Sequence, residues 1–126
     1  MVTNPALLRE LVEVGGGDQD APPLPLPAEA GIENAANHAA AFLAARGLES
    51  VWLHLDADCL DDALMPAVDW RIEGGLAPTE VIALARPLLQ SGLIAGMDVT
   101  IYNPSLDSSD FAAGRVLLDV IEQILA

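Results

Sequence analysis

The fold is decided by residues 50–58, which read Ser-Val-Trp-Leu-His-Leu-Asp-Ala-Asp. The run up to Leu55 is mostly apolar, β-branched or aromatic, which is typical of a short buried strand. Two aspartates, Asp56 and Asp58, follow it directly. A second run of the same kind, Leu-Ile-Ala-Gly-Met-Asp-Val-Thr-Ile-Tyr, occupies residues 93–102, and Asn-Pro ends it. We therefore predict two strands, the first with acidic side chains at its carboxyl end.

Helix-forming segments flank and separate the two predicted strands. Residues 28–46 are rich in helix formers and precede a glycine, which favours a helix that ends there. A second helix is predicted over residues 81–90, where Pro87 predicts a kink. A third is predicted over residues 111–125, whose apolar side chains have helical spacing, with Ser108-Ser109-Asp110 as its cap.

The order helix, strand, helix, strand, helix predicts the α/β fold class. We expect a parallel sheet with crossover helices on both faces. Two strands make a small sheet, so the chain is predicted to be one partial α/β domain over residues 1–126. Residues 6–14 fit either a short helix or a strand, and residues 15–27 are predicted to form a Gly/Pro-rich loop.

The charge balance excludes several classes of function. The chain of 126 residues has five Arg, no Lys and nineteen Asp or Glu, which gives a formal net charge of −14. Such an acidic surface repels phosphate backbones, so we expect no nucleic-acid binding. No apolar run is long enough to span a membrane, and the first residues lack a signal-peptide pattern. With a single cysteine, Cys59, these features predict a cytoplasmic protein.

Asp56 and Asp58 are candidate ligands of a metal ion. Ligands of open α/β sheets bind beyond the carboxyl ends of the strands. If the chain turns there, the two carboxylates converge, and converging carboxylates repel unless a cation or a proton lies between them. Hard divalent cations take such oxygen ligands. The residues alone leave open a second interpretation, a solvated acidic loop that binds nothing.

Two Asp-x-Asp families and one calcium motif fit this chain poorly. Haloacid-dehalogenase-like phosphatases and response-regulator receivers combine a nucleophilic Asp with a Lys, and this sequence has no Lys. An EF-hand loop requires a glycine where this chain has Asp61. The remaining comparison concerns the longer pattern that surrounds the two aspartates.

The stretch from His54 to Leu76 resembles the signature of the arginase, agmatinase and formiminoglutamase (ureohydrolase) family. Downstream, residues 92–98 and Asn103-Pro104 resemble the family's Gly-Leu, Asp and Asn-Pro segment. The resemblance covers about residues 46–126 and implies the carboxy-terminal part of an arginase-like three-layer α/β/α fold. The matching signature positions are Asp56, Asp58, Asp61, Pro66, Ala67 and Gly75.

This resemblance implies a hydrolase that cleaves a guanidino or amidino C–N bond with Mn²⁺ as cofactor. In the family two Mn²⁺ ions share a hydroxide, because the metals lower the pKa of water and orient it. Residue matching makes Asp56 and Asp58 metal ligands and places Asp98 near the site in the neighbouring strand. Asp61 matches a third acid often seen there. His54 is either a residue that orients an aspartate or a packed core histidine; no residue is assigned a directly catalytic role.

Departures from the family pattern indicate what the chain lacks. Ile101 stands where the family has a substrate-binding Glu, and the family's Asp-x-His-x-Asp ligand cluster is absent from the sequence. We therefore expect incomplete Mn²⁺ binding and no appreciable turnover of a small guanidino substrate by this chain alone. A homo-oligomer or a complementary chain is the expected partner. The alternative function is a non-catalytic arginase-like module that acts through self-association or a partner chain.

Overall fold

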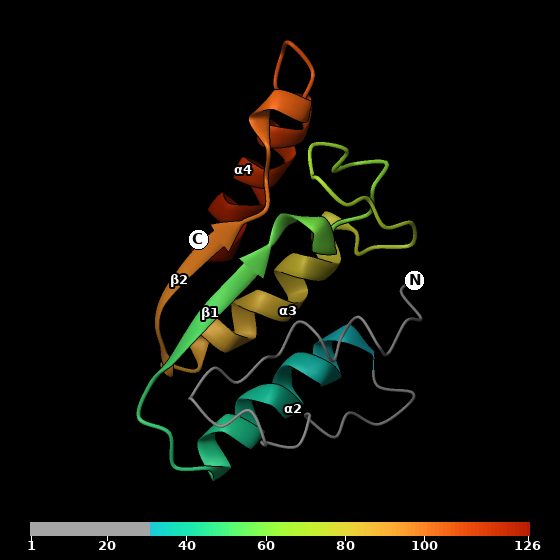
Figure 1. Ribbon diagram of the computed structural model, residues 1–126. Helices are drawn as coiled ribbons and strands as arrows, with labels where there is room; N and C mark the ends of the chain where they lie inside the picture. Colours follow the sequence, from blue (N-terminus) through green and yellow to red (C-terminus); the bar gives the residue numbers. More distant parts are fainter. Residues whose placement is uncertain (1–30) are drawn as a thin grey trace.

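The computed structural model describes residues 31–126, so the predictions for residues 6–14 and 15–27 lie outside the described residues. Helices and strands alternate in the predicted order (Figure 1). None of the described helices combines the length and the apolar character that a membrane span requires. The elements are α2 (Ile32–Ala45), β1 (Val51–Asp56), α3 (Pro78–Gln90), β2 (Ile94–Thr100) and α4 (Ala112–Leu125), with 3₁₀ turns at Ala57–Cys59 and Pro104–Leu106.

β1 and β2 form a two-stranded parallel sheet, which confirms the predicted α/β class. α3 lies between them in sequence, so both strands end at the same edge of the sheet. The register pairs His54 with Asp98 and Asp56 with Thr100. Because alternate residues of a strand share a face, these four side chains project from one face of the sheet.

The opposite face of the sheet carries the apolar side chains of Leu53, Leu55 and Val99. All three described helices pack on this face, and α3 contacts both α2 and α4. On the other face β1 presents the exposed side chains of Trp52 and His54.

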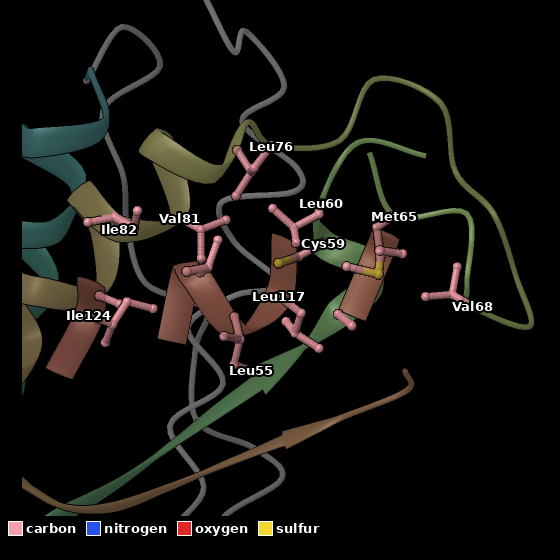
Figure 2. Packing of buried hydrophobic residues seen from close by; sticks show 14 of the residues in the cluster. Leu55, Cys59, Leu60, Met65, Val68, Leu76, Val81, Ile82, Leu117 and Ile124 are labelled. Carbon is pink, nitrogen blue, oxygen red and sulfur yellow. The ribbon is translucent and has the colours of Figure 1, made fainter. Parts of the chain in front are cut away.

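Several fully buried side chains of the described chain lie around the carboxyl end of β1. Leu60, Met65 and Leu76 are fully buried and pack in one cluster with Cys59 (Figure 2). Burying a side chain of this size contributes about 1.5–3 kcal/mol. Leu60 and Leu76 also form a parallel β-bridge, which brings together the two ends of the loop over residues 61–75.

Two glycines allow that loop to close. Gly74 has a φ of +78°, a left-handed conformation that costs a glycine little. Gly75 approaches the backbone so closely that a Cβ added there would lie 2.6 Å from the Asp61 nitrogen and 2.6 Å from the Leu60 carbonyl carbon. Only a residue without a side chain fits at position 75.

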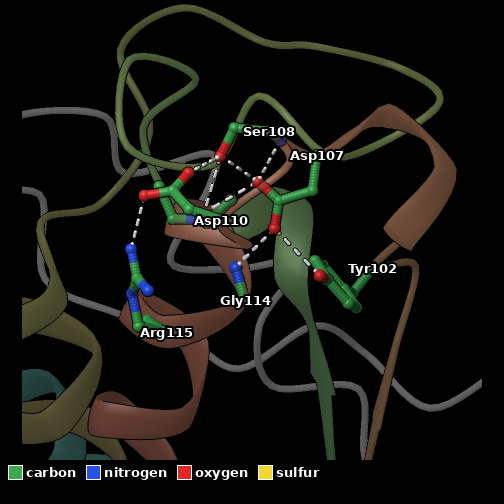
Figure 3. A network of polar contacts seen from close by, with 8 residues as sticks. Tyr102, Asp107, Ser108, Asp110, Gly114 and Arg115 are labelled. Atoms are coloured by element: carbon green, nitrogen blue, oxygen red, sulfur yellow. Dashed lines mark hydrogen bonds and ion pairs between the residues drawn. The ribbon is translucent and has the colours of Figure 1, made fainter.

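The amino end of α4 is held by Asp107 (Figure 3). Its carboxylate accepts hydrogen bonds from the N–H groups of Gly114 (2.8 Å) and Ala113 (3.1 Å) and from the Tyr102 hydroxyl (2.9 Å). Partial burial opposes ionisation, but these hydrogen bonds outweigh it and lower the pKa of Asp107 to about 2. The Ser108 hydroxyl accepts from the first N–H of α4, so the cap predicted at Ser108 is present, but sequence reasoning missed Asp107.

Candidate metal-binding site

The candidate site lies where β1 ends and the chain turns. Asp56 is the last residue of β1, and Asp58 lies in the 3₁₀ turn Ala57–Cys59 that follows. The turn is closed by a hydrogen bond from the Leu60 N–H to the Ala57 carbonyl (3.2 Å). Asp56 and Asp58 are both partly buried. The chain therefore turns between the two aspartates, as convergence of their carboxylates requires.

His54 joins the two strands through their acidic side chains. Its Nε2 lies 2.9 Å from Oδ1 of Asp56, and its Nδ1 lies 2.7 Å from Oδ1 of Asp98. The Thr100 hydroxyl donates a hydrogen bond to the same Asp56 oxygen. The structure thus brings together His54, Asp56 and Asp98, which the sequence singled out. Thr100 was missed, although it stands two residues after Asp98 and so shares its face.

The imidazole of His54 and the two carboxylates that it contacts attract one another electrostatically. The hydrogen bond to Asp98 raises the pKa of His54 above its ordinary value, and the negative charges of Asp56 and Asp98 add to this against some desolvation. The hydrogen bond from His54 in turn lowers the pKa of Asp98. A protonated imidazole donates from both ring nitrogens, so it can hold both carboxylates at once. Because these side chains are substantially exposed, the ion pairs of His54 contribute little to the stability of the fold. Their main effect is to hold the imidazole and the two carboxylates in place.

Cys59 lies beneath the two aspartates as a buried free thiol. Burial raises its pKa to about 12, and the negative charges of Asp58 and Asp56 add to the shift. The thiol therefore stays neutral near pH 7, and only a thiolate is a good nucleophile or metal ligand.

Asp61 closes the loop through hydrogen bonds to the backbone. Its Oδ1 accepts from the Ala63 N–H (3.0 Å), and its Oδ2 accepts from the Gly74 N–H (3.2 Å). Its own N–H donates to the Leu76 carbonyl (2.9 Å). Both carboxylate oxygens are thus engaged with the backbone at the two ends of the loop over residues 61–75.

The same loop is attached to the end of β2. The Asn103 N–H donates to the Ala67 carbonyl (2.8 Å), and its side-chain amide donates to Asp69 (3.0 Å). Val68 and Tyr102 form an antiparallel bridge at this point. The Asn103-Pro104 pair that ends the second predicted strand therefore also positions the loop that follows the aspartates.

The ligand set that these residues offer is partial. Carboxylate oxygens suit Mn²⁺ or Mg²⁺, and Asp56 and Asp58 stand at the carboxyl end of a strand, where ligands of open α/β sheets bind. Within residues 31–126, however, no group of three or more His, Cys, Asp or Glu side chains is placed to hold a metal ion. The described residues fit one part of a metal site, and further ligands would have to come from elsewhere.

These features define a parallel α/β protein with paired aspartates at a strand end. The chain belongs to the Arginase family, whose sequence model matches residues 27–126. It is 35% identical over 87 residues to an arginase of Staphylococcus aureus, which covers 69% of this chain and 29% of that relative. Arginase from Bacillus subtilis has a similar structure, with a TM-score of 0.68 at 26% identity over 76% of this chain and 33% of the other. Proclavaminate amidino hydrolase from Streptomyces clavuligerus gives a TM-score of 0.59 at 26% identity, over 75% of this chain and 30% of that one.

The match extends over only part of each relative. The aligned region is about a third of their length. The fold is confirmed as part of an arginase-like α/β fold. None of the site residues is tested by these comparisons, so their roles stay predictions.

Proposed function

We propose that this chain carries the Asp56–Asp58 part of a manganese-dependent site that hydrolyses a guanidino or amidino C–N bond. The observation that supports the proposal is the position of these two aspartates, at the carboxyl end of β1 and in the turn after it, within a chain of the Arginase family. The names of the matched proteins, arginase and amidino hydrolase, agree with this class of substrate.

Asp56 and Asp58 would hold the metal, which when bound lowers the pKa of a water molecule and orients it. His54 would act as a positioning residue, because it contacts Asp56 through Nε2 and Asp98 through Nδ1. Asp98 would set the orientation of that imidazole, as carboxylates do for histidines near metals. Asp61 would fix the backbone after Asp58 through its hydrogen bonds to both ends of the loop.

The 126 residues are proposed to be inactive alone, as a carboxy-terminal portion of the family fold. Two aspartates leave most of a dimetal site without ligands, and the described residues add no third ligand to them. Self-association or a complementary chain would have to complete the site and bind the small substrate. The net charge of −14 argues against nucleic acid as a partner. The single free thiol of Cys59 supports a reducing cytoplasmic location.

Mn²⁺ binding to the 126-residue protein tests the proposal. Calorimetric titration should detect weak binding to the wild type and none to the Asp56→Asn/Asp58→Asn variant. The control Glu49→Gln/Asp119→Asn removes the same charge from exposed positions elsewhere and should bind as the wild type does. Equal binding by all three proteins would remove the support for these ligands.

A turnover assay tests the proposed inactivity separately. With Mn²⁺ and a guanidino compound as substrate, the 126-residue protein should release no urea above the metal-only background. Hydrolysis at ordinary enzyme rates would show that this chain needs no further ligands, and would contradict the proposal of an incomplete site.

A further inference from the structure

Trp52 lies on the sheet face that carries His54 and Asp56, and its ring reaches across to the neighbouring strand. The register pairs Trp52 with Gly96 of β2. A Cβ added at Gly96 would lie 2.4 Å from Cζ3 and 2.7 Å from Cη2 of the indole, so the ring occupies the space that a side chain at position 96 would take. Trp52 is nonetheless 59% exposed. Burial in the core therefore does not account for this large aromatic side chain.

The indole N–H of Trp52 reaches Asp98, which lies two residues after Gly96 and shares its face. The hydrogen bond from His54 lowers the pKa of Asp98 most, and a hydrogen bond from Trp52 adds to this effect against some desolvation. An indole N–H can only donate, so the Asp98 carboxylate accepts from Trp52 as well as from His54. Because the Asp98 side chain is 47% exposed, packing does little to fix its rotamer, and the two donors restrict it instead.

We propose that Trp52 is a positioning residue for Asp56 and acts on it through Asp98 and His54. The inference rests on the proposed metal site and adds to it a residue from the exposed sheet face. Trp52 holds Asp98, Asp98 holds the imidazole through Nδ1 (2.7 Å), and the imidazole holds Asp56 through Nε2 (2.9 Å). Outer partners of this kind orient the groups that bind a metal, so their loss lowers the metal affinity although no ligand is removed.

The contact between Trp52 and Asp98 is tested first, without metal. The chain has two tryptophans, so a proton–nitrogen correlation spectrum contains two indole N–H signals, and Trp70→Phe identifies the one from Trp52. Asp98→Ala removes the acceptor and should move the Trp52 signal. Asp119→Ala, at an exposed position of α4, should leave that signal in place. A Trp52 signal that stays the same in Asp98→Ala would overturn the proposal.

The affinity for Mn²⁺ tests whether this contact acts on the metal site. Trp52→Phe keeps an aromatic ring beside Gly96 but loses the N–H, so it should raise the dissociation constant for Mn²⁺ about fivefold and leave the Tm unchanged. Trp70→Phe should bind Mn²⁺ as the wild type does. In the Asp98→Ala background Trp52→Phe should have no further effect, because the link through which it acts is already broken. A side chain that only supported the sheet would weaken binding equally in both backgrounds.

The outcomes separate this inference from the proposed function. If the wild type and Asp56→Asn/Asp58→Asn bind Mn²⁺ equally, the proposed site and the role of Trp52 are both refuted. If the wild type binds through these aspartates and Trp52→Phe binds as tightly, only the role of Trp52 is refuted. The same conclusion follows if Trp52→Phe weakens binding as much in the Asp98→Ala background as in the wild type. Far-UV circular dichroism verifies that every variant is folded.

Discussion

Replacing Gly75 by alanine tests whether the loop after the aspartates is held by close backbone packing. The new Cβ would lie 2.6 Å from the Asp61 nitrogen, 2.6 Å from the Leu60 carbonyl carbon and 2.7 Å from the Leu60 oxygen. Ordinary contact begins at 3.4 Å, so the backbone would have to move by about 0.8 Å. All three atoms belong to the main chain and cannot avoid the clash by a change of rotamer.

The cost follows from what this movement breaks. Overpacking of a rigid site costs about 1–3 kcal/mol. The shift also stretches the hydrogen bonds from Asp61 to Leu76 (2.9 Å) and from Leu76 to Cys59 (2.8 Å), each of which contributes about 1 kcal/mol. We expect Gly75→Ala to lower the free energy of unfolding by about 3 kcal/mol and the Tm by about 10 °C.

Thermal and urea unfolding followed by circular dichroism measure this effect. Gly31→Ala is the matched control, because a Cβ there meets nothing within 4 Å and φ is −64°. The control should change stability by less than about 0.5 kcal/mol. If Gly75→Ala unfolds within a degree or two of Gly31→Ala, the loop is looser than described and the argument from close approach is wrong.

Three further predictions concern the site and the start of α4. His54→Ala should weaken Mn²⁺ binding about tenfold, because Asp56 loses the imidazole that orients it. His38→Ala, at an exposed position of α2, should leave Mn²⁺ binding unchanged. Asp107 has its pKa lowered to about 2 from 3.8, so its stabilising effect is complete above that ordinary value and is lost as the pH falls toward 2. The Tm of the wild type is therefore expected to exceed that of Asp107→Asn above pH 3.8, and this difference should vanish as the pH falls toward 2. A difference in Tm that stays constant over this pH range would contradict the prediction. Cys59, buried with a pKa of about 12, should react with a thiol reagent only after unfolding, and rapid labelling of the native protein would show that the cluster opens.

Much of the fold was predictable because its signals are local. The apolar run that ends in Asp56 and the helical spacing in residues 111–125 each report a strand or a helix directly. The place of Asp98 in the strand beside the first was predicted from the match to the family pattern, and the register confirms that it lies opposite His54. The contact of Thr100 with Asp56 did not follow, because it depends on register, and a slip of one residue would turn every side chain of β2 to the other face.

The two faces of β1 differ in what they carry. Leu53 and Leu55 pack against the described helices, whereas His54 lies on the face that carries the acidic side chains. The hydrogen bonds of Asp61 could not be predicted from the sequence. They join the two ends of a loop, and no periodic sequence pattern indicates which backbone N–H a carboxylate will bind.

The arrangement around Asp56 bears on how a cation would bind. One Asp56 oxygen accepts from both His54 and Thr100, which leaves the other oxygen as the natural donor to a metal. The imidazole that occupies the first oxygen is itself held by Asp98, so three side chains fix the direction in which the second oxygen points. A carboxylate whose rotamer is set before binding loses less entropy when it becomes a ligand. Removing His54 should therefore lower the affinity for Mn²⁺ more than it lowers the stability of the fold. Removing a residue that only packs in the core should do the reverse and lower the stability of the fold more than the affinity for Mn²⁺.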